Sequence, residues 1–324
     1  MTAQDYIVST LEALKTPIRT ETIGSTSLED AIYAKVMSKK FRKLKPGEEA
    51  VRLIKNAIKL FIKNGKPIRI LEMFGGNKLW RLEEAPEIDW AELFSFTYFA
   101  QWARLIASAY EPGVTFEYFS QDISVESLDN LPRIETDRYS KAFRQMLDFI
   151  KPYLPKNIKF IYNRHYDLFK NPDDYYKELK EAKHQILENN NGKLPEMTDA
   201  MKATTELNVK LKSGQDKDPE WREKVELEHQ AIFKTPTLRK VCDNPEKIWT
   251  SPTYYPDSVI TGSTKRSYAK FWVAVGALQP YKDSFAELVL TPKQLEKAEF
   301  DWENVNIDGL KGRNFKRIRV LKNS

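Results

Sequence analysis

The chain has 324 residues, 41% of them hydrophobic and 12% aromatic, so it can bury a core sufficient for one large domain or two moderate ones. The 52 Lys and Arg residues exceed the 46 Asp and Glu residues, giving a net charge of +6. Both signs are interspersed along most of the chain, which excludes a disordered polyelectrolyte. The mild basic excess favours polyanions or phosphorylated small molecules as ligands.

Cys242 is the single cysteine, so the chain cannot form an intrachain disulfide and lacks the thiolates for a zinc site. The segment from Met1 to Asp5 lacks the basic and apolar regions of a signal peptide. No run of about 18 uncharged apolar residues follows. We therefore expect a cytoplasmic protein that does not associate with a membrane.

The first residues predict helices that lead to a strand. Residues 1–45 form an N-terminal helical segment, in which a helix begins at Leu28. From Glu48 to Asn64 apolar residues recur every three or four positions, and Gly65 follows as a C-terminal cap. The segment from Pro67 to Phe74 is short and rich in residues that favour strands, so we expect a strand that ends at a glycine loop.

The alternation of helices and strands continues to residue 165. Asp89 and Glu92 form a capping box for a helix from Trp90 to Tyr110 that is apolar on nearly every face. Next come a strand at Val114–Ser120, a helix around Asp137–Ile150 and a strand at Lys156–Tyr162. This order predicts an α/β fold, with a Rossmann-like, mainly parallel sheet and flanking helices over residues 46–165.

The second half predicts two further parts. Residues 166–250 are mostly helical and polar, which favours a helical insertion or lid. Residues 251–324 are rich in strand-forming residues, and we expect them to complete the sheet. The strands expected there are Val259–Thr261, Tyr268–Val275, Phe285–Leu290 and Phe315–Leu321.

Ligands of parallel sheets bind at the carboxyl ends of the strands. At the end of the first strand lie Gly75, Gly76, Asn77 and Lys78, whose backbone N–H groups and ammonium could hold an anion. A plain turn is the alternative. The loop matches neither the P-loop nor the Gly-x-Gly-x-x-Gly pattern. We expect no cofactor.

The next two strands end in polar residues. Ser120 and Asp122 end the second strand, and Arg164 and His165 end the third. These groups could bind polar parts of a substrate or move protons. Asp89 and Glu92 either cap their helix only, or one of them receives a substrate ammonium.

Thr264 and Lys265 lie in a later basic turn, which could bind a phosphate or could be an exposed hairpin turn. The three histidines show no His-x-x-x-His or facial-triad spacing, so we expect no metal site.

Several of these segments occur in the order of a known family. They are Asn77-Lys78, Ile88–Glu92, Tyr110–Gly113 and Ser120–Asp122, followed by Tyr139. Over about residues 28–150 the chain resembles the pyoverdine/dityrosine biosynthesis family, the isonitrile (isocyanide) synthases. It departs from the family pattern where Pro86 lies three residues before Asp89 instead of next to it, and where Gln121 separates Ser120 from Asp122.

The resemblance implies a Rossmann-like fold, and it favours a transferase or lyase of secondary metabolism. In such a reaction the amine of an amino acid condenses with the ketone of a pentulose phosphate, and fragmentation leaves the isonitrile carbon. If the activity is shared, the positions of the candidate residues at the strand ends suggest their roles: Lys78, with Arg81 or Lys265, would hold the phosphate. Asp89 or Glu92 would hold the amine, and Asp122 or His165 would move protons.

Two other interpretations stay open. The segment Ile70–Gly76, with Glu117 on the next strand, is similar to the first motif of S-adenosylmethionine methyltransferases. The basic pI of about 9.0 and the run Lys39–Lys45 would suit a nucleic-acid-binding or protein-binding protein without catalysis. We expect a small anionic substrate as the partner, and nucleic acid is not favoured.

Overall fold

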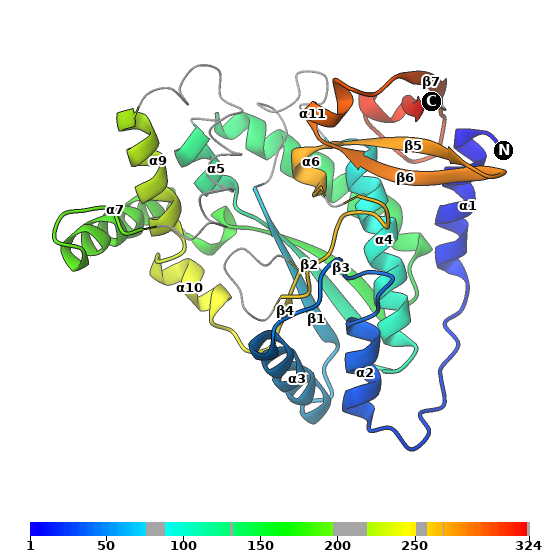
Figure 1. Ribbon diagram of the computed structural model, residues 1–324, viewed down its shortest axis with the longest axis horizontal. Helices are drawn as coiled ribbons and strands as arrows, with labels where there is room; N and C mark the ends of the chain where they lie inside the picture. Colours follow the sequence, from blue (N-terminus) through cyan, green and yellow to red (C-terminus); the bar gives the residue numbers. More distant parts are fainter. Residues whose placement is uncertain (76–87, 130–131, 197–218, 251–257, 268, 323–324) are drawn as a thin grey trace.

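The computed structural model describes residues 1–322 except 76–87, 130–131, 197–218, 251–257 and 268. Its centre is a parallel sheet with the strand order β3-β2-β1-β4 (Figure 1). The strands are β1 (Ile68–Phe74), β2 (Val114–Ser120), β3 (Ile158–Arg164) and β4 (Ile248–Trp249). The α/β class and the mainly parallel sheet predicted from the sequence are confirmed.

Both faces of this sheet are covered. Successive side chains of a strand point to opposite faces, and on β1 Ile70 and Phe74 join one hydrophobic cluster while Leu71 and Met73 join another. A parallel sheet buried on both sides needs this near-continuous apolar sequence.

The larger cluster contains residues from helices of the first half of the chain. These helices are α1 (Ala3–Lys15), α2 (Leu28–Val36), α3 (Glu48–Lys63), α4 (Trp90–Ala107) and α6 (Arg133–Ile150). Helix α4 is buried along almost its whole length, and its Phe99 stacks on Phe116 of β2 with ring centroids 4.5 Å apart. The predicted capping box of Asp89 and Glu92 is present, and Gly65 after α3 has φ +60°.

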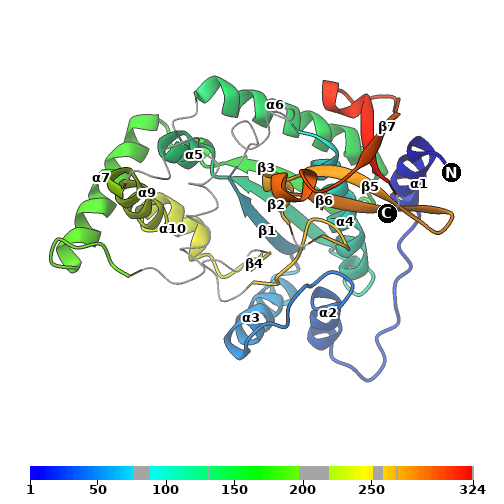
Figure 2. The ribbon, with the colours of Figure 1, turned by 45° about the horizontal axis from the view of Figure 1, so that its top comes forward.

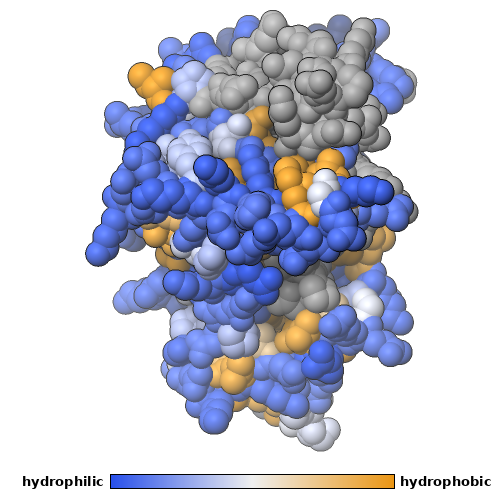
Figure 3. Space-filling view, turned by 90° about the vertical axis from the view of Figure 1, so that its left-hand side faces the viewer, coloured by the Kyte–Doolittle hydropathy of each residue, from blue (hydrophilic) through white to orange (hydrophobic). Residues whose placement is uncertain are grey.

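The smaller cluster lies between the opposite face of the sheet and a second group of helices. These are α5 (Asp122–Asp129), α7 (Pro172–Asn189), α9 (Pro219–Ile232) and α10 (Pro236–Cys242). Figure 3 shows the end of the molecule that carries α7 and α9, where hydrophilic residues dominate and apolar residues are scattered. The helical, polar character expected between residues 166 and 250 therefore reflects amphipathic helices that pack on the sheet.

The last part of the chain forms a separate mixed sheet with the order β6-β5-β8-β7. Its strands are β5 (Val275–Tyr281), β6 (Ser284–Leu290), β7 (Phe300–Asn304) and β8 (Arg317–Leu321), with the short helix α11 (Pro292–Leu295) after β6. We expected the strands after residue 251 to complete the first sheet. Among the described residues they form this second sheet instead, and the first sheet gains only β4, which precedes residue 251. In Figures 1 and 2, β5 and β6 lie beside α1 and α4.

Gly276 explains where the second sheet sits. A Cβ at this position of β5 would meet Trp90 at 2.4 Å, and the Gly276 N–H donates to Asp89 Oδ2 at 3.3 Å. The start of α4 therefore presses directly on β5, and the second sheet forms a layer on α4.

Two predicted strands differ in the structure. At Val259–Thr261 there is an isolated bridge from Thr261 to Arg42 in place of a strand, and the Lys43 N–H donates to the Ile260 carbonyl. Within the expected strand Tyr268–Val275, Phe271–Val273 is a 3-10 helix. Strands β4 and β7, and β5 apart from its first residue, were not predicted. Among the described residues, no helix has the length and apolar character needed to cross a membrane.

Gly113→Ala should destabilise the protein by about 2 kcal/mol or more, because Gly113 has φ +80° and a Cβ there would lie 1.8 Å from the Asn157 carbonyl oxygen. The measurement is the free energy of unfolding in urea. Gly24→Ala is the matched control, since nothing lies within 4 Å of its added Cβ. Equal stability of the two variants would contradict the assignment of Gly113 to a sterically closed turn.

Candidate active site at the carboxyl edge of the parallel sheet

Three strands end side by side. Phe74 is in register with Ser120, and Ser120 is in register with Arg164. The chain segments Glu72–Gly75, Ser120–Asp122 and Arg164–His165 are therefore neighbours at one edge of the sheet, as the strand order in the sequence predicted.

Asp122 and Arg164 form a buried ion pair at this edge. Arg164 Nε donates to Asp122 Oδ2, and Arg164 also donates to Asp137 Oδ1 of α6 at 2.6 Å. The second oxygen of Asp122 accepts the backbone N–H groups of Ile123 and Tyr166 at 3.0 and 3.2 Å. Burial raises the pKa of Asp122 to about 6 in spite of the guanidinium. The carboxyl group can therefore exchange a proton near neutral pH.

Tyr162 lies next to this pair on β3. Its hydroxyl forms a 2.8 Å hydrogen bond with Ser140 Oγ of α6. Burial, with the nearby Asp122 charge, raises the pKa of Tyr162 to about 12, so the phenol stays protonated. Ser120 is fully buried beside it.

Asp89 and Glu92 lie at the start of α4, and both are buried. Asp89 Oδ1 accepts the Ala91 N–H at 2.8 Å, and Glu92 Oε2 accepts the Asp89 N–H at 2.9 Å. The other oxygen of Glu92 accepts the hydroxyl of Tyr139 at 2.8 Å. Burial, with the Glu92 charge, raises the pKa of the Tyr139 hydroxyl. Capping is thus one role of these carboxylates, and Glu92 also binds a tyrosine of α6.

Glu72 forms the second buried ion pair. It lies on β1 with none of its surface exposed, and Lys270 Nζ donates to both of its carboxylate oxygens at 3.0 and 3.2 Å. Thr250, after β4, donates to Glu72 Oε2, and Lys270 Nζ also reaches Thr261 Oγ1 at 3.3 Å. Thr250 and Lys270, far apart from β1 in the sequence, thus both bind Glu72.

Aromatic rings connect the two ion pairs. The Tyr118 hydroxyl is fully buried, and its pKa is raised by burial and by the charges of Glu72 and Glu92. Phe74, the last residue of β1, packs with its ring centroid 6.3 Å from Tyr118, 6.4 Å from Tyr139 and 6.2 Å from Tyr162. These residues form one buried layer of charged and phenolic groups, which we call the carboxyl-edge network. Its core residues are Glu72, Glu92, Tyr118, Asp122, Tyr139, Tyr162, Arg164 and Lys270.

His165 lies apart from this network. Its ring packs against Phe119, Phe169 and Tyr175, and Nδ1 forms a 3.1 Å hydrogen bond with Ser124 Oγ. Within the described residues Nε2 has no hydrogen-bond partner. Burial lowers the pKa of His165 to about 3, so the imidazole is neutral at physiological pH.

The remaining predicted residues fall into two groups. Thr264 is buried and accepts the Ser267 N–H at 3.1 Å, whereas Lys265 is exposed and its carbonyl accepts Lys43 Nζ at 2.6 Å. Gly75 follows β1 directly. Gly76, Asn77, Lys78 and Arg81 lie outside the described residues.

Four residues of the network were not among the candidate site residues of the sequence: Glu72, Tyr118, Tyr162 and Lys270. Glu72 carried a signal, because a carboxylate within a strand that is otherwise apolar must find a buried partner. Lys270 precedes the aromatic run Phe271-Trp272, but nothing in its local sequence points to a residue 198 positions earlier.

Glu117 has a structural partner. It lies three residues before the end of β2, and Arg69 of β1 approaches its carboxylate to 2.5 Å. Asn163 of β3 donates to its other oxygen at 2.8 Å. The methyltransferase interpretation used Glu117 as an acid near the strand end. Its carboxylate is instead paired with Arg69 and Asn163 of the neighbouring strands.

The described residues hold no group of three His, Cys, Asp or Glu side chains that could bind a metal ion.

Fold and network together define an α/β protein with buried, ionisable side chains at the carboxyl edge of its parallel sheet. Among solved structures, the PvcA protein from Pseudomonas aeruginosa is similar in fold, with a TM-score of 0.62. The match covers 91% of this chain and 100% of PvcA at 15% sequence identity. No protein-family model matches the chain, and no curated protein matches it.

The pKa of His165 predicts acid sensitivity. A histidine with a folded pKa of about 3 and an unfolded pKa of about 6.5 binds more protons when unfolded, so its stabilising effect is complete above pH 6.5 and is lost as the pH falls toward 3. His165→Gln should therefore reduce the loss of unfolding free energy between pH 7 and pH 4 by about 3 kcal/mol.

The measurement is urea unfolding at a series of pH values. His184→Gln is the control, because His184 is 65% exposed and should leave the pH dependence unchanged. The same pH dependence in His165→Gln as in the unmodified protein would show that His165 does not carry this effect.

Proposed function

We propose that this chain is an isonitrile-synthase-like biosynthetic enzyme that acts on an amino acid or amine and on a phosphorylated sugar. One observation carries the proposal. Segments that resemble the isonitrile synthases, far apart in the sequence, meet in the carboxyl-edge network: Tyr139 donates to Glu92, Ser120 is the last residue of β2, and Asp122 is the first residue of α5. The similarity of fold to PvcA, over 91% of the chain, agrees with the Rossmann-like fold that the family resemblance implies.

Asp122 is the proposed proton carrier. Its pKa of about 6 lets it accept a proton near neutral pH, and Arg164 holds the carboxylate in place. His165 stays neutral at this pH and lies among aromatic rings, so we propose that it supports the strand end through Ser124.

The substrate amine would meet Glu92 or Asp89. Each carboxylate oxygen has two lone pairs, so an ammonium could join the existing hydrogen bonds at the start of α4. Buried carboxylates attract an ammonium more strongly than exposed ones do. Burial of Glu92 therefore suits recognition of an amine that has left water.

We assign the phosphate to Lys78 with Arg81 or Lys265, as expected from the sequence. Lys265 is exposed, and it follows a buried turn next to Lys43. Lys43 in turn lies near Lys270: burial lowers the pKa of Lys43, and the positive charge of Lys270 lowers it further. A cationic region thus borders the Glu72 end of the network, and it suits a phosphorylated substrate.

The pH profile of product formation tests the role of Asp122. With an amino acid and a pentulose phosphate as substrates, kcat should rise with pH through about 6, because only the ionised carboxylate accepts a proton. Asp122→Asn should lower kcat by roughly a hundredfold or more and remove this rise. Mass spectrometry of the isonitrile product gives the rates.

Asp148→Asn is the control, since Asp148 is an exposed carboxylate of α6 outside the network. Circular dichroism of each variant separates loss of folding from loss of chemistry. A folded Asp122→Asn protein with unchanged kcat and an unchanged rise near pH 6 would disprove the assigned role. Absence of product from the unmodified protein with every amino acid would contradict the proposed function itself.

A further inference from the structure

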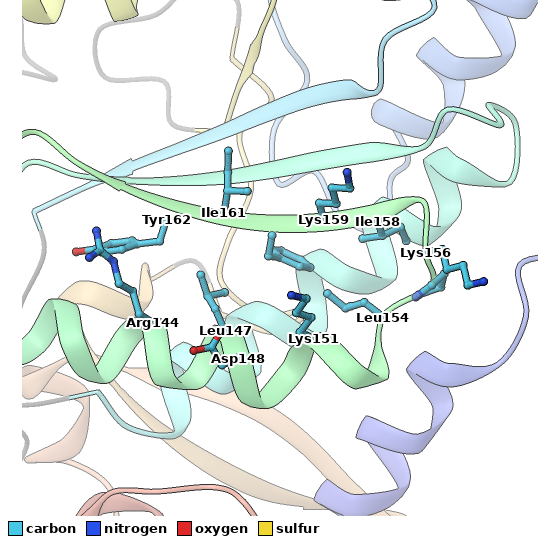
Figure 4. A pocket seen from close by; sticks show the side chains of 12 residues that line it. Arg144, Leu147, Asp148, Lys151, Leu154, Lys156, Ile158, Lys159, Ile161 and Tyr162 are labelled. Carbon is cyan, nitrogen blue, oxygen red and sulfur yellow. The ribbon is translucent and has the colours of Figure 1, made fainter. Parts of the chain in front are cut away.

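A groove lies between β3, an edge strand of the parallel sheet, and helix α6. Its volume is about 650 Å³, within the roughly 300–1,000 Å³ typical of ligand pockets. Figure 4 shows Arg144, Leu147, Asp148 and Lys151 of α6 and its continuation opposite the side chains of β3. The groove borders the carboxyl-edge network only at Tyr162, and nothing in the proposed reaction uses it.

Strand β3 has one unpaired edge. It is the terminal strand in the order β3-β2-β1-β4. The Asn157 carbonyl accepts from Val114 at 2.9 Å, and the His165 N–H donates to Ser120 at 2.7 Å. Because hydrogen bonding alternates along a strand, the odd-numbered residues from 157 to 165 face β2. The N–H and C=O groups of Phe160 and Tyr162 therefore point outward, where no described strand pairs with them.

The groove combines an apolar floor with a basic rim. The floor is formed by Leu147, Leu154, Ile158, Phe160 and Tyr162. The rim carries four cations, Arg144, Lys151, Lys156 and Lys159, and the acid Asp148. Arg144 is also paired with Asp167 at 3.1 Å. Lys159 and the 36% exposed Ile161 project from the face of β3 opposite to the floor (Figure 4). An edge strand with lysines resists uncontrolled pairing, but lysines alone do not account for an apolar groove of this size.

We propose that the β3 edge binds an extended, acidic segment of another protein as an added strand. The free backbone groups supply the hydrogen bonds of strand addition, and the groove accepts alternate apolar side chains. The four cations of the rim favour Glu or Asp at the positions between them. A second copy of this chain fits less well, because pairing β3 with itself would bring two sets of the same lysines together.

The test uses a seven-residue peptide that alternates Glu and Val, acetylated and amidated at its ends, which matches the length of β3. Binding is measured by calorimetry on the full chain. The Glu/Val peptide should bind, and the corresponding Lys/Val peptide should not. Lys151→Glu combined with Lys159→Glu should weaken binding by about tenfold or more. Both lysines are exposed, so the variant should fold.

Backbone pairing has its own readout. N-methylation of the peptide at one set of alternate residues should abolish binding, whereas N-methylation at the other set should leave it intact, since only alternate N–H groups face the strand. No binding of the Glu/Val peptide at millimolar concentration would overturn the proposal. Equal binding of both methylated peptides would overturn it in favour of a simple anion site. Self-association of the chain that charge reversal strengthens would overturn it in favour of a second copy.

Discussion

The structure depends on one constraint: Glu72 lies on a strand that is buried on both faces, and its charge needs a partner there. An unpaired carboxylate in such a place would be strongly destabilising. Lys270 supplies the partner, with Thr250 as a further donor to the carboxylate. This requirement fixes the segment before the 3-10 helix Phe271–Val273 against β1. It thereby positions β5, which follows two residues later and packs on α4 through Gly276.

The same constraint shapes the chemistry of the sheet edge. The charges of Glu72 and Glu92 raise the pKa of Tyr118, and the charge of Asp122 raises the pKa of Tyr162. Buried groups that interact in this way have shifted pKa values, and such groups cluster at functional sites. Asp122 is the clearest case, because burial brings its pKa into a useful range while Arg164 keeps the carboxylate anchored. The ion pair that stabilises the fold and the groups proposed to act in the reaction therefore belong to one network.

Local features were predictable from the sequence, and long-range partners were not. The capping box of Asp89 and Glu92 depends on residues three positions apart, and the structure contains it. The bond from Tyr139 to Glu92 spans 47 positions, so no local pattern reveals it. Similarly, the order of helices and strands indicated a parallel sheet, because each crossover has few possible geometries.

The C-terminal part shows the limit of such reasoning. Alternating apolar residues identify a strand, but they do not say which sheet it joins. Strand β5 also contains Gly276 and Pro280, which lowered its strand signal, while the preceding Phe271–Val273 has strand-forming residues and folds as a 3-10 helix. Similarly, His165 was expected beside Asp122 because both end neighbouring strands. Its ring lies among Phe119, Phe169 and Tyr175 instead, in contact with Ser124.

The most direct test of a biosynthetic site at the sheet edge is a thermal-shift screen of the full chain. The ligands are amino acids, pentose and pentulose phosphates, S-adenosylmethionine, and pairs of an amino acid with a sugar phosphate. A ligand that binds only the folded state raises Tm, by a few degrees when its concentration is about a hundred times Kd. Our account predicts that an amino acid and a pentulose phosphate together raise Tm more than either alone. A rise with S-adenosylmethionine, and none with these pairs, would contradict it.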